Sequence, residues 1–157
     1  MGEAAKSPLR VHFDRRLKLE FRGTTITSDA GLLAFRELDD ALGLTTMAAS
    51  RLTECRKGKN TQHTLVALLR QSIFGRLAGY EDVNDAERLR LDPAMRALVD
   101  HGDASRYAAS TSEMARFETN LLATEENLQT LGGLSGLWIK RVYERTALKD
   151  LVLDMDS

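Results

Sequence analysis

Two aspartates near the end of the sequence have a spacing that could serve chemistry on phosphate groups. Asp154 and Asp156 follow the apolar residues 151–153, which predict a strand covered on both faces. Residues two apart on a strand point to the same side, so both carboxylates would face one way. Carboxylate oxygens suit Mg²⁺, but two-metal phosphoryl transfer also needs carboxylates from other elements. From spacing alone, an acidic chain terminus is the commoner explanation.

A second candidate is the start of a helix that could read DNA. A Ser-x-x-Glu capping box begins at Ser110 and predicts a well-capped helix. Ser112, Arg116 and Asn120 follow at helical spacing, and such side chains near a helix N-terminus can reach base edges and phosphates. With the helix predicted over 93–100, the segment is typical of a helix-turn-helix element. The alternative is an ordinary amphipathic helix with a good cap.

Basic residues gather in the N-terminal third of the chain. Residues 1–60 hold 11 Lys or Arg and 8 Asp or Glu, whereas residues 61–157 hold 11 and 15. The clusters that give this excess are Arg15, Arg16, Lys18 and Arg22, followed by Arg56, Lys57 and Lys59. Phosphate contact is one interpretation, and a solvated face is the other. The net charge of the whole chain is only -1, so there is no global signature of nucleic-acid binding.

Other kinds of site are not indicated. His12, His63 and His101 lie in unrelated segments without metal-ligand spacing, and the single cysteine, Cys55, excludes a disulfide framework. The glycines of 132–136 match neither phosphate-binding loop. No long apolar run or signal peptide is present, so we expect no membrane association and a cytoplasmic location.

The remaining sequence predicts a mainly helical fold with an N-terminal β-ribbon. Apolar and charged residues alternate over 9–22, which is the period of half-buried strands. Beyond the ribbon, helical periodicity predominates. About six helices are predicted, in the segments 28–43, 47–54, 64–78, 84–90 with 93–100 directly after it, 110–122 and 125–146.

The apolar stripe of the first helix and the glycines of the last helix predict how these two helices pack. In the first helix, Ser28 or Asp29 would be the cap, Gly43 the terminator, and one stripe would be buried: Leu32, Phe35, Leu38 and Leu42. In the last helix, three glycines each weaken the helix by up to ~1 kcal/mol relative to alanine, namely Gly132, Gly133 and Gly136. They predict close packing against another backbone, or a break.

Four segments, read together, resemble bacterial insertion-sequence transposases of the DDE class. They are "FDRRLKLEFRGTTITSDAGLLAFRELDDALGL", "GYEDVNDAERLRLDPAMRAL", "STSEMARFETN" and "LVLDMDS", in this order. The block from Gly79 to Pro93 is the most specific part, because composition alone would hardly produce it. The resemblance covers nearly the whole chain from Phe13 onward.

The resemblance implies a role for the terminal aspartates. In that family the "LDMDS" strand opens an RNase H-like catalytic core and supplies the first acid of the DDE triad. By this likeness Asp156, followed by Ser157, is the catalytic and metal-binding residue, and Asp154 is the alternative. The complete family enzyme cuts and joins DNA with a divalent cation, expected to be Mg²⁺. Because the second Asp and the Glu are missing, we expect neither catalysis nor tight metal binding by this fragment alone.

We therefore predict the N-terminal, DNA-binding part of a DDE transposase, with the double-stranded terminal repeats of the element as its partner. The resemblance also implies a bacterial, nucleoid-associated protein. Three regions are predicted: a basic arm and β-ribbon over 1–27, a helical DNA-binding region over 28–123, and a final helix with the first strand of a truncated catalytic domain over 124–157. The rival hypothesis is a protein-interaction fragment that self-associates, or that oligomerises with and inhibits full-length transposase. A third is a non-functional remnant.

Overall fold

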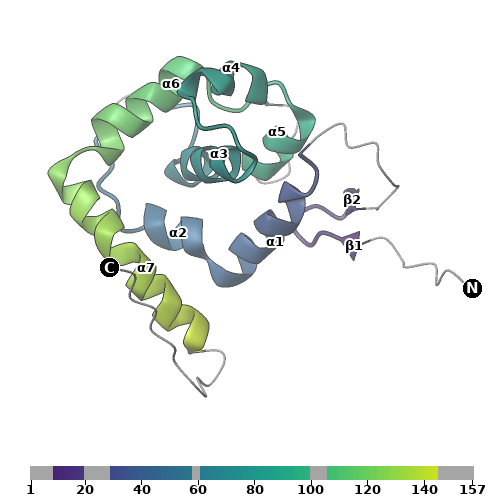
Figure 1. Cartoon of the computed structure of the whole chain (residues 1–157), viewed down its shortest axis with the longest axis horizontal. Coiled ribbons are helices and arrows are strands. Elements are labelled where there is room, and N and C mark those ends of the chain that lie inside the picture. Colours follow the sequence, from purple (N-terminus) through teal and green to yellow (C-terminus); the bar gives the residue numbers. More distant parts are fainter. Residues whose placement is uncertain (1–8, 20–28, 58–60, 100–105, 145–157) are drawn as a thin grey trace, which may run out of the picture.

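The structure is a computed structural model and describes residues 9–19, 29–57, 61–99 and 106–144. Within these ranges the fold is mainly helical, as predicted (Figure 1). None of the described helices is long and apolar enough to cross a membrane. The helical elements are α1 (Leu32–Leu42), α2 (Leu44–Ala49), α3 (Leu65–Leu77), the 3₁₀ turn η1 (Val83–Asp85), α4 (Ala86–Leu89), α5 (Pro93–Val99), α6 (Thr111–Arg116), the π-helical segment η2 (Phe117–Leu122) and α7 (Glu125–Tyr143).

The N-terminal residues form a short antiparallel pair. Strand β1 (Leu9–Arg10) pairs with β2 (Lys18–Leu19), with Leu9 opposite Leu19 and Arg10 opposite Lys18. Each strand contributes two residues to this pair. The pair is much shorter than the β-ribbon predicted over 9–22, and the described residues show no more of that ribbon. The predicted terminal strand over 151–156 lies outside the described residues.

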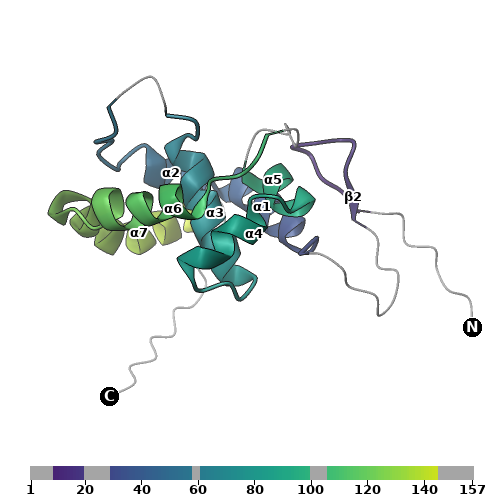
Figure 2. The ribbon, with the colours of Figure 1, turned by 90° about the horizontal axis from the view of Figure 1, so that it is seen from above.

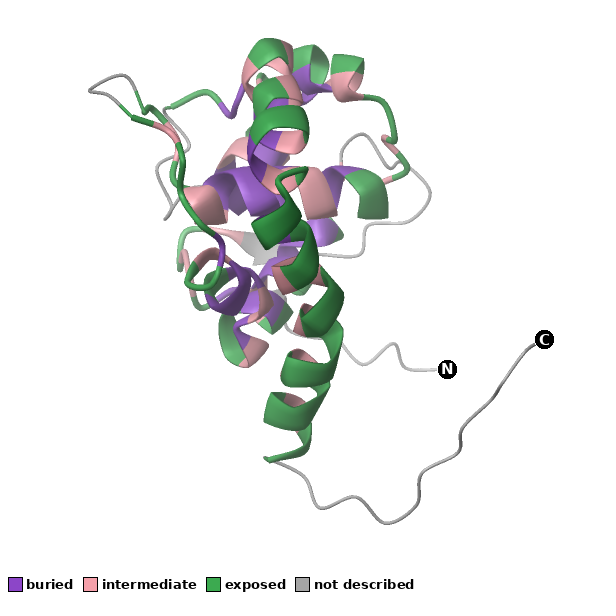
Figure 3. Ribbon diagram, turned by 90° about the vertical axis from the view of Figure 1, so that its left-hand side faces the viewer, coloured by how far each residue is buried: buried purple, intermediate pink, exposed green. Residues whose placement is uncertain are grey.

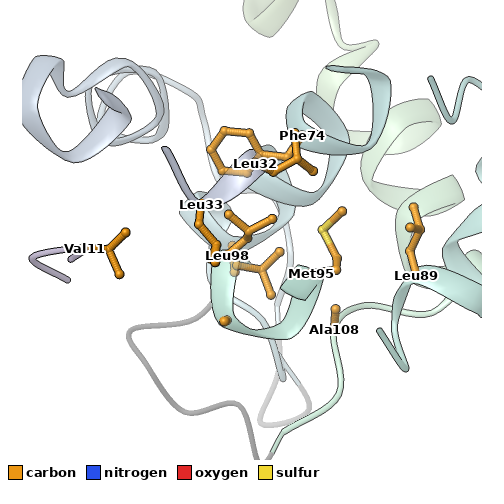
Figure 4. Packing of buried hydrophobic residues seen from close by; sticks show 11 residues of the cluster. Val11, Leu32, Leu33, Phe74, Leu89, Met95, Leu98 and Ala108 are labelled. Carbon is orange, nitrogen blue, oxygen red and sulfur yellow. The ribbon is translucent and has the colours of Figure 1, made fainter. Parts of the chain in front are cut away.

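Helix α3 lies at the centre of the helical part. Figures 1 and 2 both place it between α1 and α5 on one side and α6 on the other. It contributes to both apolar clusters of the core, with Phe74 in one and Leu68 in the other. The first cluster reaches from Val11, beside the β-pair, to Ala108 (Figure 4). Because α3 is covered on several sides, its buried residues do not form a single stripe.

The buried face of α1 differs from the predicted one. Phe35 and Leu38 are 47% and 50% exposed, while Arg36 and Asp39 are buried together with Leu32 and Leu33. The prediction for Phe35 and Leu38 is therefore wrong. Its physical reason is that α1 meets α3 partly through ion pairs, so polar side chains occupy positions that an apolar periodicity would assign to the surface.

Arg36 and Arg70 join α1, α3 and α5 inside the protein. The Arg70 Nε atom is 3.1 Å from Asp39 Oδ2, and its Nη2 atom is 2.7 Å from Asp40 Oδ1. The Arg36 Nε atom is 3.0 Å from Asp40 Oδ2, and its Nη1 atom donates to the carbonyl of Leu98. Burial lowers the pKa of the Arg36 guanidinium, and the positive charge of Arg70 lowers it further. The two carboxylates oppose these effects, so both guanidiniums are paired in the interior.

Gly43 joins α1 directly to α2. It ends α1 as predicted, in the left-handed conformation with φ of 71°, and its N–H donates to the carbonyl of Asp39. Helix α2 follows at once, earlier than predicted, and the Asp39 carboxylate accepts a hydrogen bond from the Thr45 N–H at 2.8 Å. An added Cβ at Gly43 would meet the Arg141 guanidinium of α7 at 3.1 Å.

Helix α7 is held at its N-terminal end. Asn127 is buried there; its Oδ1 atom accepts from the Thr53 N–H at 2.8 Å and its Nδ2 atom donates to the Leu121 carbonyl at 2.8 Å. Most of the rest of the helix is exposed (Figure 3). An added Cβ on each of its three glycines, Gly132, Gly133 and Gly136, would meet nothing within 4 Å. The helix does not break at them, and among the described residues no other backbone packs closely there; the predicted close packing stays a prediction.

Candidate nucleic-acid interface

Helix α6 begins where the sequence predicts. Ser110 is its N-cap, with Oγ accepting from the Glu113 N–H at 3.4 Å. Ser112, Arg116 and Asn120 are all exposed, so they are accessible for contact. Ser112 and Arg116 are one helical turn apart on α6, whereas Asn120 lies in the π-helical segment. Contact of these three side chains with DNA remains a prediction.

The capping box is only half formed, because the Glu113 carboxylate turns to another partner. Its Oε2 atom is 2.9 Å from Nδ1 of His63, whose Nε2 atom is 3.0 Å from the carbonyl oxygen of Tyr107. Both ring nitrogens thus lie within hydrogen-bond distance of an oxygen atom, one of a carboxylate and one of a backbone carbonyl. His63 therefore connects the segment before α3 with α6 and with residue 107.

The predicted helix-turn-helix stays a prediction. Helix α5 is described as far as Val99 and α6 begins at Thr111, and residues 100–105 between them lie outside the described residues. Helix α6 packs beside η1 and α4.

The site that sequence reasoning missed surrounds Tyr107. This side chain is 56% exposed, and the Cζ atoms of Arg90 and Arg96 each lie 5.3 Å from the centre of its ring. The Arg96 Nε atom also donates to the carbonyl of Arg106 at 3.0 Å. Two guanidiniums on an exposed aromatic ring place positive charge and flat surface together, and each such contact contributes about 0.5–1 kcal/mol. We call Arg90, Arg96, Arg106 and Tyr107 the Tyr107 cluster.

A recess of about 370 Å³ connects the Tyr107 cluster with the start of α6. Arg90 and Arg106 supply cationic donors to its walls, and the Nε atom of Arg90 is buried without a hydrogen-bond partner in the described part of the chain. Unsatisfied donors beside positive charge suit an anion. The lining residues are Gln62, His63, Arg90, Arg106, Tyr107, Ala108, Ser110 and Glu113.

A paired hydrogen bond fixes the backbone beside the recess. Gln71 of α3 is buried; its Nε2 atom donates to the Ala109 carbonyl at 2.8 Å, and its Oε1 atom accepts from the Ala109 N–H at 2.7 Å. An amide side chain thus satisfies both backbone groups of one residue, as a neighbouring strand would. The segment that carries Tyr107 is therefore anchored to the central helix.

Some residues of the predicted basic clusters are exposed, and others form ion pairs with neighbouring carboxylates. Arg15 and Lys57 are exposed, as phosphate contact requires. Arg16 forms an ion pair with Asp14, with Nη2 and Oδ2 2.7 Å apart. Arg56 is bound to Glu54 at 2.6 Å, and its hydrogen bond to that carboxylate raises the pKa of Arg56. Three predicted contact residues lie outside the described side chains: Lys18, Arg22 and Lys59.

Arg56 nevertheless brings the second basic cluster close to the recess. Its Nη1 atom donates to the carbonyl of His63 at 3.0 Å, and His63 lines the recess. Arg56 thus contacts a residue of the recess that Arg90 and Arg106 also line, although these arginines are far apart in the sequence. The signal that could have identified this region is the arginine content of 88–106 together with Tyr107; no periodicity relates these residues.

The predicted catalytic and metal-binding residues are untested. Asp154 and Asp156 lie outside the described residues, so no geometry describes them. Within the described ranges no group of three or more His, Cys, Asp or Glu side chains could hold a metal ion.

The comparison with protein families identifies the chain. The family described as transposase DDE domain group 1 matches residues 9–157. No curated protein and no solved structure matches the chain significantly. The family match extends from the first strand of the β-pair, across every helix described above, to the segment that contains the two predicted catalytic aspartates. The chain therefore belongs to the transposase DDE domain group 1 family.

Proposed function

We propose that the described helices form a DNA-binding region of a DDE transposase, and that the recess at the Tyr107 cluster and the exposed residues of α6 contact the ends of the element. The family match supports a function in transposition. The observation that carries the DNA-binding proposal is the Tyr107 ring, exposed and flanked by two guanidiniums beside the start of α6.

The chemistry of the cluster suits the DNA backbone. Arginine donates in a fork that matches phosphate oxygens, and a tyrosine hydroxyl is a common donor to the same atoms. Arg106 is exposed, and among the described residues its side chain makes one long hydrogen bond, at 3.5 Å to the Gln62 carbonyl. Its guanidinium is accordingly well placed to bind a phosphate. Ser112 and Arg116, on the exposed side of α6, are proposed to approach the adjacent groove.

For catalysis we propose Asp156 as the first acid of the triad, with Asp154 as the alternative. The divalent cation of the complete enzyme, proposed to be Mg²⁺, would bind a hard oxygen donor such as the Asp156 carboxylate.

Fluorescence anisotropy with a labelled duplex of the element end tests the DNA-binding proposal. The protein should bind this duplex more tightly than a scrambled duplex of equal length at low salt. Arg106→Gln should weaken binding about tenfold, because one charge-assisted hydrogen bond to phosphate is lost. Tyr107→Ala should weaken DNA binding by a similar factor, because Arg90 and Arg96 lose the aromatic ring on which their guanidiniums stack.

A matched control lies elsewhere on α4. Arg88 stacks on Tyr80, with Cζ 4.8 Å from the ring centre, in an Arg–Tyr pair of the same kind outside the recess. Arg88→Gln should leave the affinity within about twofold of the unmodified protein. Equal losses for Arg88→Gln and Arg106→Gln, or no preference for the element end, would contradict the proposal.

A further inference from the structure

One side of α1 is apolar and exposed. Successive residues of an α-helix turn by about 100°, which places five residues of α1 within an arc of about 120°. These residues, which we call the outer side, are Ala34, Phe35, Leu38, Ala41 and Leu42. Phe35 and Leu38 are about half exposed, and neither belongs to the two apolar clusters of the described residues.

The charged residues of α1 all turn away from the outer side. Arg36, Asp39 and Asp40 belong to the ion pairs between α1 and α3. The fourth, Glu37, accepts a hydrogen bond through Oε1 from the Phe13 N–H at 3.0 Å, next to the β-pair. The outer side therefore carries no charged side chain of its own, whereas a solvated helix face normally does. An exposed apolar surface of this kind marks a contact surface.

The end of α7 lies beside the end of α1. The Arg141 guanidinium is close to Gly43, on which an added Cβ would meet it at 3.1 Å. Gly43 ends α1, and Leu38 precedes it by five residues, about 7.5 Å along the helix axis. The described part of α7 continues to Glu144, within about one helical turn of Arg141. The chain therefore passes into residues 145–157 from a point close to α1.

An apolar run lies within reach of this point. Residues 151–153 are Leu, Val and Leu, and they lie outside the described residues. From Glu144 to Leu151, seven residues of extended chain span up to about 24 Å. Along the helix axis, the outer side extends at most about 14 Å from Gly43. The length of the chain thus allows the apolar run to lie along the outer side.

We propose that the segment 151–155 packs on the outer side of α1, with Leu151, Leu153 and Met155 against the helix. Side chains alternate along an extended segment, so these three share one side, and Asp154 and Asp156 share the other. The packing itself does not depend on the proposed function. Its consequence for catalysis does: on the proposal that Asp156 is a triad acid, α1 supports the segment so that both carboxylates face away from the helical region.

Two other occupants of the outer side are possible on apolar character alone. The segment 20–28 precedes α1, but its large apolar residues, Phe21 and Ile26, are separated by polar ones and form no continuous run. A second copy of the chain is the other alternative. Both are outcomes of the experiments below, and either one would overturn the proposal.

Disulfide cross-linking within the full chain tests the packing. Leu38→Cys and Leu153→Cys are combined in a Cys55→Ser background, which removes the single native cysteine, and the protein is oxidised at low concentration. A disulfide needs Cβ atoms within about 4.5 Å, so its formation reports direct packing. The disulfide within one chain should form at least about tenfold faster than in the matched control, Leu77→Cys with Leu153→Cys. Leu77 is 54% exposed and ends α3.

The alternation along the segment gives a second comparison. With Leu38→Cys, Val152→Cys should cross-link at least about threefold more slowly than Leu153→Cys, because residue 152 faces away from the helix. Equal rates for these two pairs, or for the Leu38 and Leu77 pairs, would overturn the proposal. So would a disulfide between two chains, or faster cross-linking of Leu38→Cys to Ile26→Cys.

Alkylation of one thiol measures the same packing without a disulfide. In the Cys55→Ser background, iodoacetamide should modify Leu38→Cys about five- to tenfold more slowly than Leu77→Cys, because the segment covers the first thiol. Leu153→Asp should remove this protection, since a carboxylate is costly to bury against apolar side chains. Leu91→Asp, at another exposed leucine, should not remove it. Circular dichroism checks that the variants keep their helices.

Lack of protection at Leu38→Cys, or protection that persists with Leu153→Asp, would also overturn the proposal. Neither measurement involves DNA or a metal ion. A failure of the protein to bind the element end would therefore contradict the proposed function and leave this inference standing.

Discussion

At the scale of single residues, the interior of this protein depends on charged side chains as well as apolar ones. Arg70 is 1% exposed and bound to two carboxylates of α1. Its removal would leave Asp39 buried beside the hydroxyl and N–H of Thr45 without the guanidinium that forms an ion pair with it. The loss of one partner of a buried pair is more damaging than the pair is stabilising, since the remaining charge keeps its cost of desolvation.

Arg70→Leu should therefore lower the free energy of unfolding by about 3–5 kcal/mol, measured by urea denaturation. Arg76→Leu is the control on the same helix: Arg76 is exposed and pairs with Glu118 at 2.9 Å. Its loss should cost no more than about 1 kcal/mol, as expected for a surface pair. Comparable losses in the two variants would show that the buried network is not structurally important.

Asp14 provides a prediction about pH. The side-chain hydrogen bonds from Arg16 lower the pKa of Asp14 from 3.8 to about 2. Because the pKa is lower in the folded state, the pair favours folding above about pH 4, and this contribution disappears as the pH falls through 2. In a carbon NMR titration, Arg16→Gln should return the Asp14 carboxyl toward its ordinary pKa. Arg15→Gln, which changes the neighbouring exposed arginine, should leave it near 2.

At the scale of elements, the junction of α1 and α2 depends on one backbone conformation. Gly43→Ala should lower the free energy of unfolding by about 1–2 kcal/mol, because a side chain is strained at a φ of 71°. The Arg141 guanidinium would also have to move. Gly31→Ala is the control, at a helical φ of -58° with nothing within 4 Å of the added Cβ, and it should stabilise the protein slightly. Thermal unfolding of both variants distinguishes these outcomes.

The helices were largely predictable from the sequence, whereas their contacts were not. Gly43, the cap at Ser110 and the apolar periodicity locate α1, α6 and α7 because these signals are local. The buried face of α1 was not predictable, because Arg36 and Asp39 are buried only by virtue of partners on α3 and α5. The Tyr107 cluster escaped prediction for the same reason: its arginines come from separate segments that meet only in the fold.

At the scale of the whole molecule, a net charge of -1 gives DNA no general attraction to this chain. Binding must then depend on local positive charge. In the anisotropy experiment above, repeated at several salt concentrations, the affinity should fall with salt on a slope that reflects only the few phosphate contacts at the recess. Arg106→Gln should reduce the magnitude of that slope by about 1, whereas Arg88→Gln should leave it unchanged.

The π-helical segment between α6 and α7 has a consequence for insertions and deletions. It winds more residues into a turn than an α-helix does, while Phe117 and Leu121 remain buried. Because the segment already fits one extra residue into its turns, removal of a single residue here restores regular α-helix and leaves the direction of α6 nearly unchanged. Insertion of one further residue would instead turn Ser112 and Arg116 by about 100°. The segment should therefore tolerate a deletion better than an insertion.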